Sequence, residues 1–391
     1  MFKRLIAFFG VFSIFMLFST NALANDDIDF TLDYRSSLDY SDFYQDIITS
    51  EEWIETENRA IRGELLQLPK EMLLNMDTAT LIDAVLNYPY FRDIYAFDDV
   101  QLGVDKLFRT FNGAVELLNR SNVGEILLDK YISMTVLSSN DAQTMDMVSV
   151  GDIVYELSNV EVLLAQDFVI NSLSKSEIKV LSEAVSQKYT EKLSNNSYCG
   201  TVDSFYELFY ANCDDVSIRE QVSVLATYTY VSTPKGSKVL VVERGEELSA
   251  DEIASNHKWV KDNYPSATRL GSSTTKYNCH SYAWYSQSTS NKYWMVSPLA
   301  YINDGSYLSA PSPVKNNRMI WFTNGEPTHS AIVQSVLSGP VNMNYGYTDL
   351  VIVNSKWGQL GLYRHNGMNS PYWDNNTYTA FYLPLYSSLT V

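Results

Sequence analysis

The sequence predicts an α+β protein: a mainly helical region over residues 25–230, then a region over 231–391 in which helices pack on an antiparallel sheet. Charge separates the two regions, because the first carries 14 Lys and Arg against 36 Asp and Glu, and the second carries 12 against 10. Apolar residues recur at three-and-four spacing in the first and at alternate positions in the second. All four His and six of the seven Trp lie in the second. We therefore expect two domains, joined near the turn at 233–236.

Residues 1–24 have the features of a secretory signal peptide. A basic pair, Lys3-Arg4, precedes an apolar run over 5–18, and Ala22 and Ala24 give the small-x-small pattern of a cleavage site. The apolar run is short for a membrane span. We expect an exported protein, secreted or associated with the cell wall, that has no membrane contact after cleavage.

The acidic region 25–230 is expected to form a helical bundle. Its helical periodicity is clearest over 81–86, 115–118, 126–132 and the longer stretch 160–193. The Asp and Glu side chains suit a solvated face that keeps the protein soluble, and they would also suit docking on the C-terminal domain or on another protein. A net charge of −18 argues against nucleic-acid binding, which needs a basic face.

The second region alternates helix and strand signals. A strand is expected over 238–242, and the S-x-x-E pattern at 249–252 is a capping box for a helix that ends before Tyr264-Pro265. Another helix is expected to begin near Cys279. The sheet then follows, with strands expected over 319–323, 328–336, 350–355, 362–365 and 378–385, and a turn at 324–327.

The cysteine count singles out one thiol. Cys199 and Cys213 lie close in sequence and can form a disulfide, which leaves Cys279 alone in the second region. Asn278 is a good N-cap residue, so Cys279 falls in the first turn of a helix. The free N–H groups and the helix dipole at that position lower a thiol pKa, which favours a nucleophile over a buried structural cysteine.

A nucleophile needs a base, and His329 is the better candidate. His280 is adjacent to Cys279, but successive helical residues point about 100° apart, so we interpret it as a packing or substrate contact. His329 opens a strand and shares a face with Ala331 and Val333, which suits a face covered by the helix that begins at Cys279. The residue that orients the imidazole should come from the next strand. Asn354 and Ser355 are both candidates, as is His365 one strand later, and spacing does not decide among them.

The order of these residues resembles papain-like cysteine hydrolases, most closely the NlpC-type and CHAP-type cell-wall peptidases and amidases. The segments that carry the resemblance are YNCHSYAW, RMIWFTNG, THSAIV and VIVNSKWG, and it covers about 233–391. It departs from the usual pattern because His280-Ser281 follow the cysteine where Ser-Gly is usual. The resemblance implies a papain-like fold, Cys279 as nucleophile, His329 as general base, and Asn354 or Ser355 as the third residue.

Together these features predict a hydrolase that cleaves an amide bond in a peptidoglycan stem peptide or a protein through a thioester. Asn278 and His280 lie beside the thiol, and Tyr277 is a candidate second donor to the oxyanion. Trp284 and Trp357 could line a substrate groove or belong to the core. No metal or organic cofactor is expected, since HExxH and CxxC spacings do not occur. The alternatives are a non-catalytic surface or interaction protein that retains the fold, and a latent form in which the acidic half covers the other.

Overall fold

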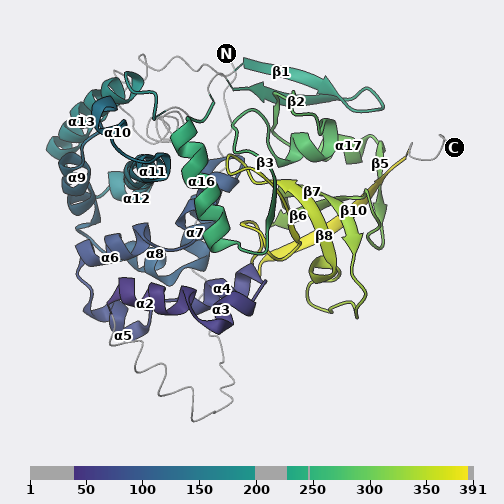
Figure 1. Cartoon of the computed structure of the whole chain (residues 1–391), viewed down its shortest axis with the longest axis horizontal. Coiled ribbons are helices and arrows are strands. Elements are labelled where there is room, and N and C mark those ends of the chain that lie inside the picture. The colour runs from purple at the N-terminus through teal and green to yellow at the C-terminus, as the bar shows by residue number, and fades with distance from the viewer. Residues whose placement is uncertain (1–38, 199–226, 245–246, 386–391) are drawn as a thin grey trace, which may run out of the picture.

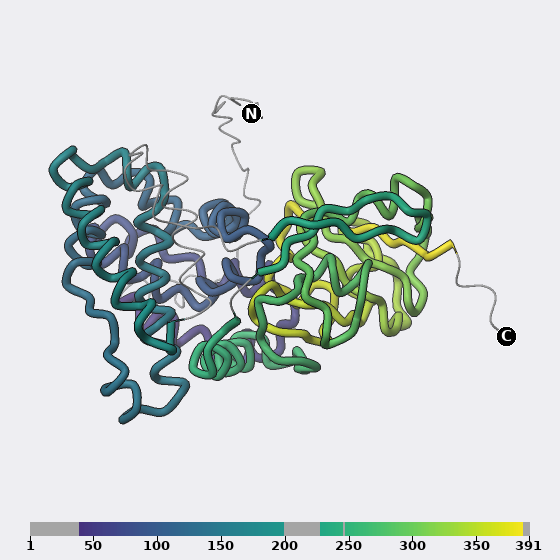
Figure 2. The backbone as a smooth tube through the Cα atoms, turned by 90° about the horizontal axis from the view of Figure 1, so that it is seen from above, coloured from purple at the N-terminus to yellow at the C-terminus, as the bar shows by residue number. Residues whose placement is uncertain are grey.

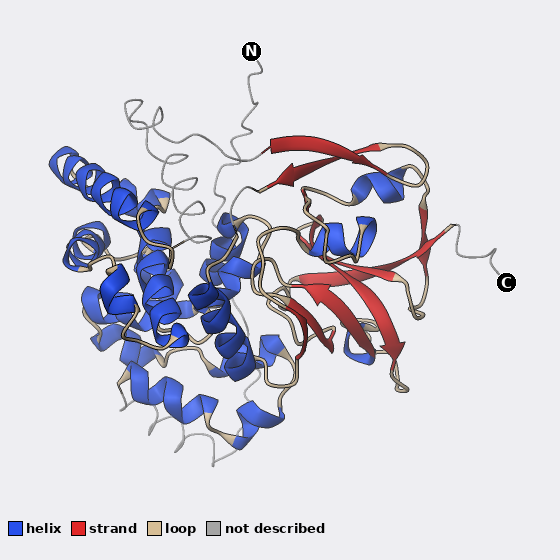
Figure 3. Cartoon of the chain, turned by 45° about the horizontal axis from the view of Figure 1, so that its top comes forward, coloured by secondary structure: helices blue, strands red, loops and turns tan. Residues whose placement is uncertain are grey.

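The computed structural model describes residues 39–198, 227–244 and 247–385, and it is a mixed α+β structure. The helices of the N-terminal half gather on one side of the molecule and the antiparallel sheets on the other (Figure 1, Figure 3). The expected signal peptide and the expected Cys199–Cys213 pair lie outside the described residues. Within the described residues, no helix is both long enough and apolar enough to span a bilayer.

The N-terminal half is built from short helices with polar N-caps. Asp39, Asp77, Asp99 and Asp146 each accept backbone N–H groups at the start of a helix, so part of the acidity serves capping. The helices are α2 (Tyr40–Ile48), α3 (Glu51–Glu55), α4 (Arg59–Leu65), α5 (Lys70–Asn75), α6 (Thr78–Leu86), the 3₁₀ helix η1 (Phe91–Ala96), α7 (Val100–Thr110), α8 (Asn112–Leu117), α9 (Val123–Ser133), α10 (Ser139–Ala142), α11 (Met147–Leu164), α12 (Asp167–Ile170) and α13 (Lys175–Leu193).

The helical stretch expected over 160–193 is divided among three helices. Helix α11 ends at Leu164, the single turn α12 follows, and α13 begins at Lys175. The break has a local cause, because Ser174 and Glu177 form a capping box that starts a new helix. The apolar spacing runs through the break because both long helices bury residues in the same core.

The C-terminal half contains two antiparallel sheets. Strands β1, β2 and β4 form a three-stranded sheet, and the larger sheet has the order β3-β9-β8-β7-β6-β10-β5. The strands are β1 (Thr227–Ser232), β2 (Lys238–Glu243), β3 (Thr268–Gly271), β4 (Trp294–Met295), β5 (Tyr307–Ala310), β6 (Arg318–Thr323), β7 (Glu326–Val336), β8 (Val351–Lys356), β9 (Leu362–Asn366) and β10 (Thr377–Pro384). The expected strands are therefore confirmed to within about two residues. The short helix α17 (Leu299–Asn303) and the 3₁₀ turn η3 (Thr348–Leu350) complete this half.

Helix α16 (Ala250–Asn263) joins the two halves. Its expected capping box, Ser249 with Glu252, is present, and the helix ends before Tyr264 as expected. It packs along α11 of the N-terminal half. The two helices approach closely at Gly151 of α11, where a Cβ would lie 2.2 Å from the carbonyl oxygen of Asp251. One continuous core includes residues of the N-terminal helices and of the larger sheet, so the two halves are not packed as independent units. The view from above shows the N-terminal and C-terminal halves lying side by side (Figure 2).

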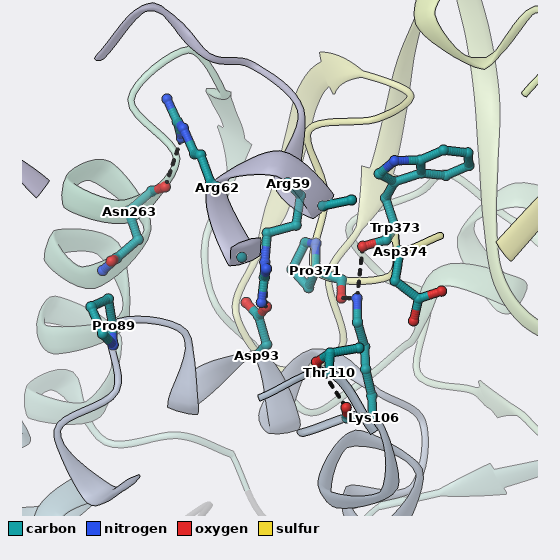
Figure 4. A network of polar contacts seen from close by, with 12 residues as sticks. Arg59, Arg62, Pro89, Asp93, Lys106, Thr110, Asn263, Pro371, Trp373 and Asp374 are labelled. Carbon is teal, nitrogen blue, oxygen red and sulfur yellow. Dashed lines mark hydrogen bonds and ion pairs between the residues drawn. The ribbon is translucent and has the colours of Figure 1, made fainter. Parts of the chain in front are cut away.

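Buried polar contacts hold this boundary (Figure 4). Lys106 of α7 donates through Nζ to the carbonyl oxygens of Pro371, at 2.5 Å, and Trp373, at 2.9 Å. Arg109 forms an ion pair of 2.7 Å with Asp374. The loop 367–376 is thereby attached to the N-terminal half.

Candidate active site

The structure starts the helical turn where the sequence predicts. Asn278 accepts the N–H of Ser281 at 3.0 Å through Oδ1, as an N-cap does. Asn278 also exchanges two hydrogen bonds with the backbone of Met295 in β4, at 2.8 and 3.0 Å, which fixes the turn against the small sheet. The turn continues as the π-helix η2 (Ser281–Tyr285) and then stops.

The expected activation of the Cys279 thiol is wrong for this arrangement. Cys279 is fully buried, and burial, followed by the neighbouring Asp98 carboxylate, raises the pKa of the thiol well above its ordinary value. Backbone hydrogen bonds from Ser330 and His280 to the sulfur lower the pKa, but they only partly offset the rise. A helical turn this short has a small dipole, so it does not overcome the cost of desolvation.

Asp98, from the N-terminal half, places its carboxyl group beside the thiol. It lies between η1 and α7, and its Oδ1 is 3.8 Å from Cys279 Sγ while Oδ2 is 3.3 Å from His280 Nε2. Its side chain is 17 % exposed. Burial raises the pKa of Asp98 to about 7, with Asn278, Arg244 and Cys279 acting in the opposite direction. The carboxyl group therefore ionises at a higher pH than a free Asp side chain does.

Backbone contacts bring Asp98 to this place. The segment Tyr95–Asp98 runs along the loop after β8, where the Tyr95 carbonyl accepts the N–H of Gln359 at 3.1 Å. The Ala96 carbonyl accepts the hydroxyl of Tyr372. The Phe97 ring packs on the same Tyr372, with ring centroids 5.0 Å apart. We call Tyr95–Asp98 the covering segment.

The His280 ring is uncharged, and a hydrogen bond fixes its orientation. Its Nδ1 lies 2.7 Å from Ser330 Oγ, which also accepts the indole N–H of Trp284 at 2.9 Å. Burial lowers the pKa of His280 to about 3. The ring is thus neutral, fixed through Nδ1 by β7, and turned with Nε2 towards Asp98.

His329 lies on β7 as predicted, but not on the face that was predicted. Ala331 and Val333, which share its face, belong to the core formed with the N-terminal helices, whereas Ile332 packs with Trp284 of the Cys279 turn in a second cluster. The turn that begins at Cys279 therefore covers the Ser330 face of the strand. The reasoning failed because β7 is buried on both sides, so alternation could not show which partner covers which face.

His329 is fully buried, and neither of its ring nitrogens has a hydrogen-bond partner among the described residues. Its ring stacks on Tyr372, with centroids 3.5 Å apart and an interplanar angle of 10°. Burial, with smaller contributions from His365 and His280, lowers the pKa of His329 well below its ordinary value. Burying an imidazole without hydrogen-bond partners costs free energy. A change of conformation or a bound ligand could supply the missing partner to the His329 ring.

None of the candidate third residues forms a hydrogen bond with the His329 ring in the described part of the chain. Ser355 Oγ lies 2.6 Å from His365 Nε2, and it accepts the indole N–H of Trp357 at 3.0 Å. Asn354, on the opposite face, accepts Arg364 Nε at 3.1 Å. Ser355, His365 and Trp357 thus form a separate buried group.

The aromatic candidates are core residues in this structure. Trp357 is fully buried against Tyr264 and Tyr363, and Trp284 packs on Tyr301 and Tyr307. Tyr277 is 7 % exposed and packs in the second cluster. Of the two interpretations offered for Trp284 and Trp357, the structure supports the core and not an open groove.

Asp98, Ser330 and Lys356 are the site residues that sequence reasoning missed. Lys356 is buried, donates to the carbonyl oxygens of Thr274 and Gly358, and has its pKa lowered to about 7 by burial. Asp98 had one usable signal: in the pair Asp98-Asp99, Asp99 alone caps α7, by accepting the N–H of Gln101 at 2.8 Å. That leaves Asp98 without a capping role.

Comparisons with known proteins found no matching family model, no matching curated protein and no matching solved structure.

Proposed function

We propose that this protein is an exported thiol hydrolase whose C-terminal region is papain-like, of the NlpC and CHAP kind, with Cys279 as nucleophile and His329 as general base. The substrate class is an amide bond in a peptide or a peptidoglycan stem peptide. One observation carries the proposal: His280, the residue after Cys279, lies with Nδ1 2.7 Å from Oγ of Ser330, the residue after His329 on β7. The thiol and an imidazole that has no hydrogen-bond partner among the described residues thus lie on segments in direct contact.

The chemistry follows from these groups. His329 takes the thiol proton, and the thiolate attacks the substrate carbonyl carbon to form a tetrahedral oxyanion. Backbone N–H groups at the start of the helical turn are the donors available to that oxyanion. The C–N bond then breaks, the imidazolium protonates the leaving amine, and water hydrolyses the thioester to return the thiol.

The described arrangement is interpreted as a resting state. A neutral thiol beside a carboxylate is a weak nucleophile. Asp98 occupies the side of the sulfur towards the N-terminal half, and Tyr372 stacks on the ring of His329. Catalysis therefore requires the covering segment to move away, the Tyr372–His329 stack to open, and the His329 ring, which lies on the opposite face of β7 from the Cys279 turn, to come within reach of the sulfur.

The test is product analysis by mass spectrometry after incubation of the purified protein with peptidoglycan and, separately, with a mixed peptide substrate. We expect new amine and carboxyl termini from the wild type and none from Cys279→Ser or His329→Gln. His257→Gln is a matched control because His257 belongs to α16 and contacts Ser273, outside the site. Cleavage that persists in Cys279→Ser would refute the mechanism.

A second candidate function is a non-catalytic exported interaction protein. The observation that favours it is the complete burial of Cys279 and His329. It predicts that no condition that opens the covering segment yields amide cleavage. Truncation near residue 231 does not separate the two candidates, because it would expose the shared core; point substitutions in the covering segment do.

A further inference from the structure

We propose that Asp98, Cys279 and His280 form a binding site for a zinc-class divalent metal ion that bridges the two halves of the chain. The three side chains offer a carboxylate oxygen, a sulfur and an imidazole nitrogen that all lie within 4.8 Å of one another. Asp98 comes from the N-terminal half, and Cys279 and His280 come from the helical turn of the C-terminal half. The grouping could not be found as a sequence motif because its members are some 180 residues apart.

The spacing of the donor atoms suits tetrahedral coordination. With Zn–N and Zn–O bonds of about 2.0–2.1 Å and Zn–S of about 2.3 Å, neighbouring ligand atoms of a tetrahedron are roughly 3.3–3.6 Å apart. With Asp98 Oδ2 as the ligand atom, His280 Nε2 lies 3.3 Å from it and Cys279 Sγ lies 4.0 Å from it. The imidazole and carboxylate are therefore already at ligand spacing, and a small approach of the sulfur completes a three-ligand set with a fourth position open for water.

The imidazole is already oriented as a ligand. Ser330 Oγ contacts His280 Nδ1 at 2.7 Å and is itself held by the indole N–H of Trp284 at 2.9 Å. A hydrogen bond at one ring nitrogen that fixes the tautomer and directs the other nitrogen at the ion is the usual outer-shell arrangement of metal-bound His. Here the second nitrogen, Nε2, faces Asp98.

The donor set selects the class of metal. A thiolate with an imidazole favours zinc and its chemical relatives, whereas magnesium and calcium prefer sets made of oxygen. Binding displaces the thiol proton to solvent, so that the thiolate, the carboxylate and the divalent ion sum to zero charge. A neutral set is the form that a buried site accommodates at least cost.

Two consequences follow. The ion ties the covering segment to the Cys279 turn, so it stabilises the packing of the two halves. It also occupies the sulfur, so zinc inhibits amide cleavage; this second consequence rests on the proposed function, and the first does not.

The experiment uses the purified protein, freed of metal by chelation and kept reduced. Zinc is titrated by calorimetry, and cobalt(II) is added as a spectroscopic probe whose thiolate charge-transfer and tetrahedral ligand-field bands report the ligands. We expect one ion per chain and a rise in thermal unfolding temperature with zinc. Cys279→Ser should remove the charge-transfer band, which also excludes the other two cysteines as its source.

Substitutions define the ligand set. We expect Asp98→Asn and His280→Gln to weaken zinc binding by at least about 10-fold, and Ser330→Ala to weaken it by roughly 10- to 100-fold through loss of the outer-shell contact. Asp99→Asn is the matched control, because it removes a neighbouring carboxylate that caps α7 and does not face the sulfur; it should bind zinc as the wild type does.

Absence of a charge-transfer band in the folded wild type overturns the proposal without reliance on any variant. Zinc binding of unchanged strength in Cys279→Ser or in Asp98→Asn overturns it as well. Amide cleavage is assayed separately on the metal-free protein, so the proposal of a zinc site and the proposal of hydrolase activity can be refuted independently.

Discussion

Replacing Gly358 with alanine should loosen the covering segment and uncover Cys279. Gly358 has φ +42°, and a Cβ there would lie 2.4 Å from the Ala96 carbonyl oxygen and 2.6 Å from that of Tyr95. Ordinary contact begins at 3.4 Å, so the two segments must separate by roughly 1 Å. Overpacking of this kind costs about 1–3 kcal/mol.

Gly346→Ala isolates that cost. Gly346 has φ +61° with no atom within 4 Å of the added Cβ, so both variants incur the left-handed backbone cost of about 1–2 kcal/mol, and only Gly358→Ala adds the clash. The difference of 1–3 kcal/mol corresponds to a roughly 5- to 150-fold larger population of the opened state.

The assay is alkylation of Cys279 by iodoacetamide under native conditions, followed by peptide mapping, with urea unfolding of both variants. We expect Gly358→Ala to be alkylated at least about 5-fold faster than Gly346→Ala. Equal alkylation rates, in variants whose unfolding free energies differ as calculated, would show that the segment does not control access to the thiol.

Three further predictions concern the boundary between the halves. Burial lowers the pKa of Lys106 from 10.5 to about 7, so between these pH values the unfolded chain keeps the proton and the folded chain has lost it. The unfolding free energy of the wild type, measured in urea relative to Lys106→Met, should therefore rise from pH 7 to pH 10.5 by at most about 5 kcal/mol. A difference that does not change with pH would refute the pKa assignment. In the wild type, the buried Asp93 carboxylate lies 2.9 Å from Arg59 Nη2 and also accepts the hydroxyl of Tyr264. Arg59→Met leaves Tyr264 as the remaining hydrogen-bond donor to Asp93, so it should lower the unfolding free energy by about 3–5 kcal/mol. Lys179→Met, which removes one partner of an exposed ion pair, should have no measurable effect. Gly151→Ala should destabilise by about 1–3 kcal/mol in spite of its better helix propensity, because the added Cβ meets the backbone of α16; a gain in stability would mean that α11 and α16 are not in this contact.

Local signals predicted the elements of the fold well. The capping box at Ser249 and the N-cap at Asn278 act within three residues of themselves, so the sequence alone defines where those helices begin. The strands of the larger sheet were recognisable because alternation and turn residues are also local. The break before α13 was harder to predict, because the capping box at Ser174 indicates a new helix while the apolar spacing continues through the break.

The site could be predicted only in part, because its chemistry depends on contacts between distant segments. The sequence placed Cys279 at a helical start, but the pKa of its thiol is governed by burial and by Asp98, which comes from the other half of the chain. The sequence also placed His329 on a strand, but the partner on its face is Tyr372 and not the cysteine turn. Neither contact leaves a periodic signal.

The central claim is that Cys279 is a reactive thiol held back by the Asp98 carboxyl group. The measurement that tests it most directly is the pH dependence of Cys279 alkylation, followed by peptide mapping, in the wild type and in Asp98→Asn. We predict that the wild type reacts slowly, with a midpoint above the value of about 8.5 for a free cysteine, and that Asp98→Asn reacts faster with a lower midpoint, because the carboxylate no longer opposes the thiolate. A wild-type thiol that reacts as a free cysteine does, or a midpoint that Asp98→Asn leaves unchanged, would contradict the account.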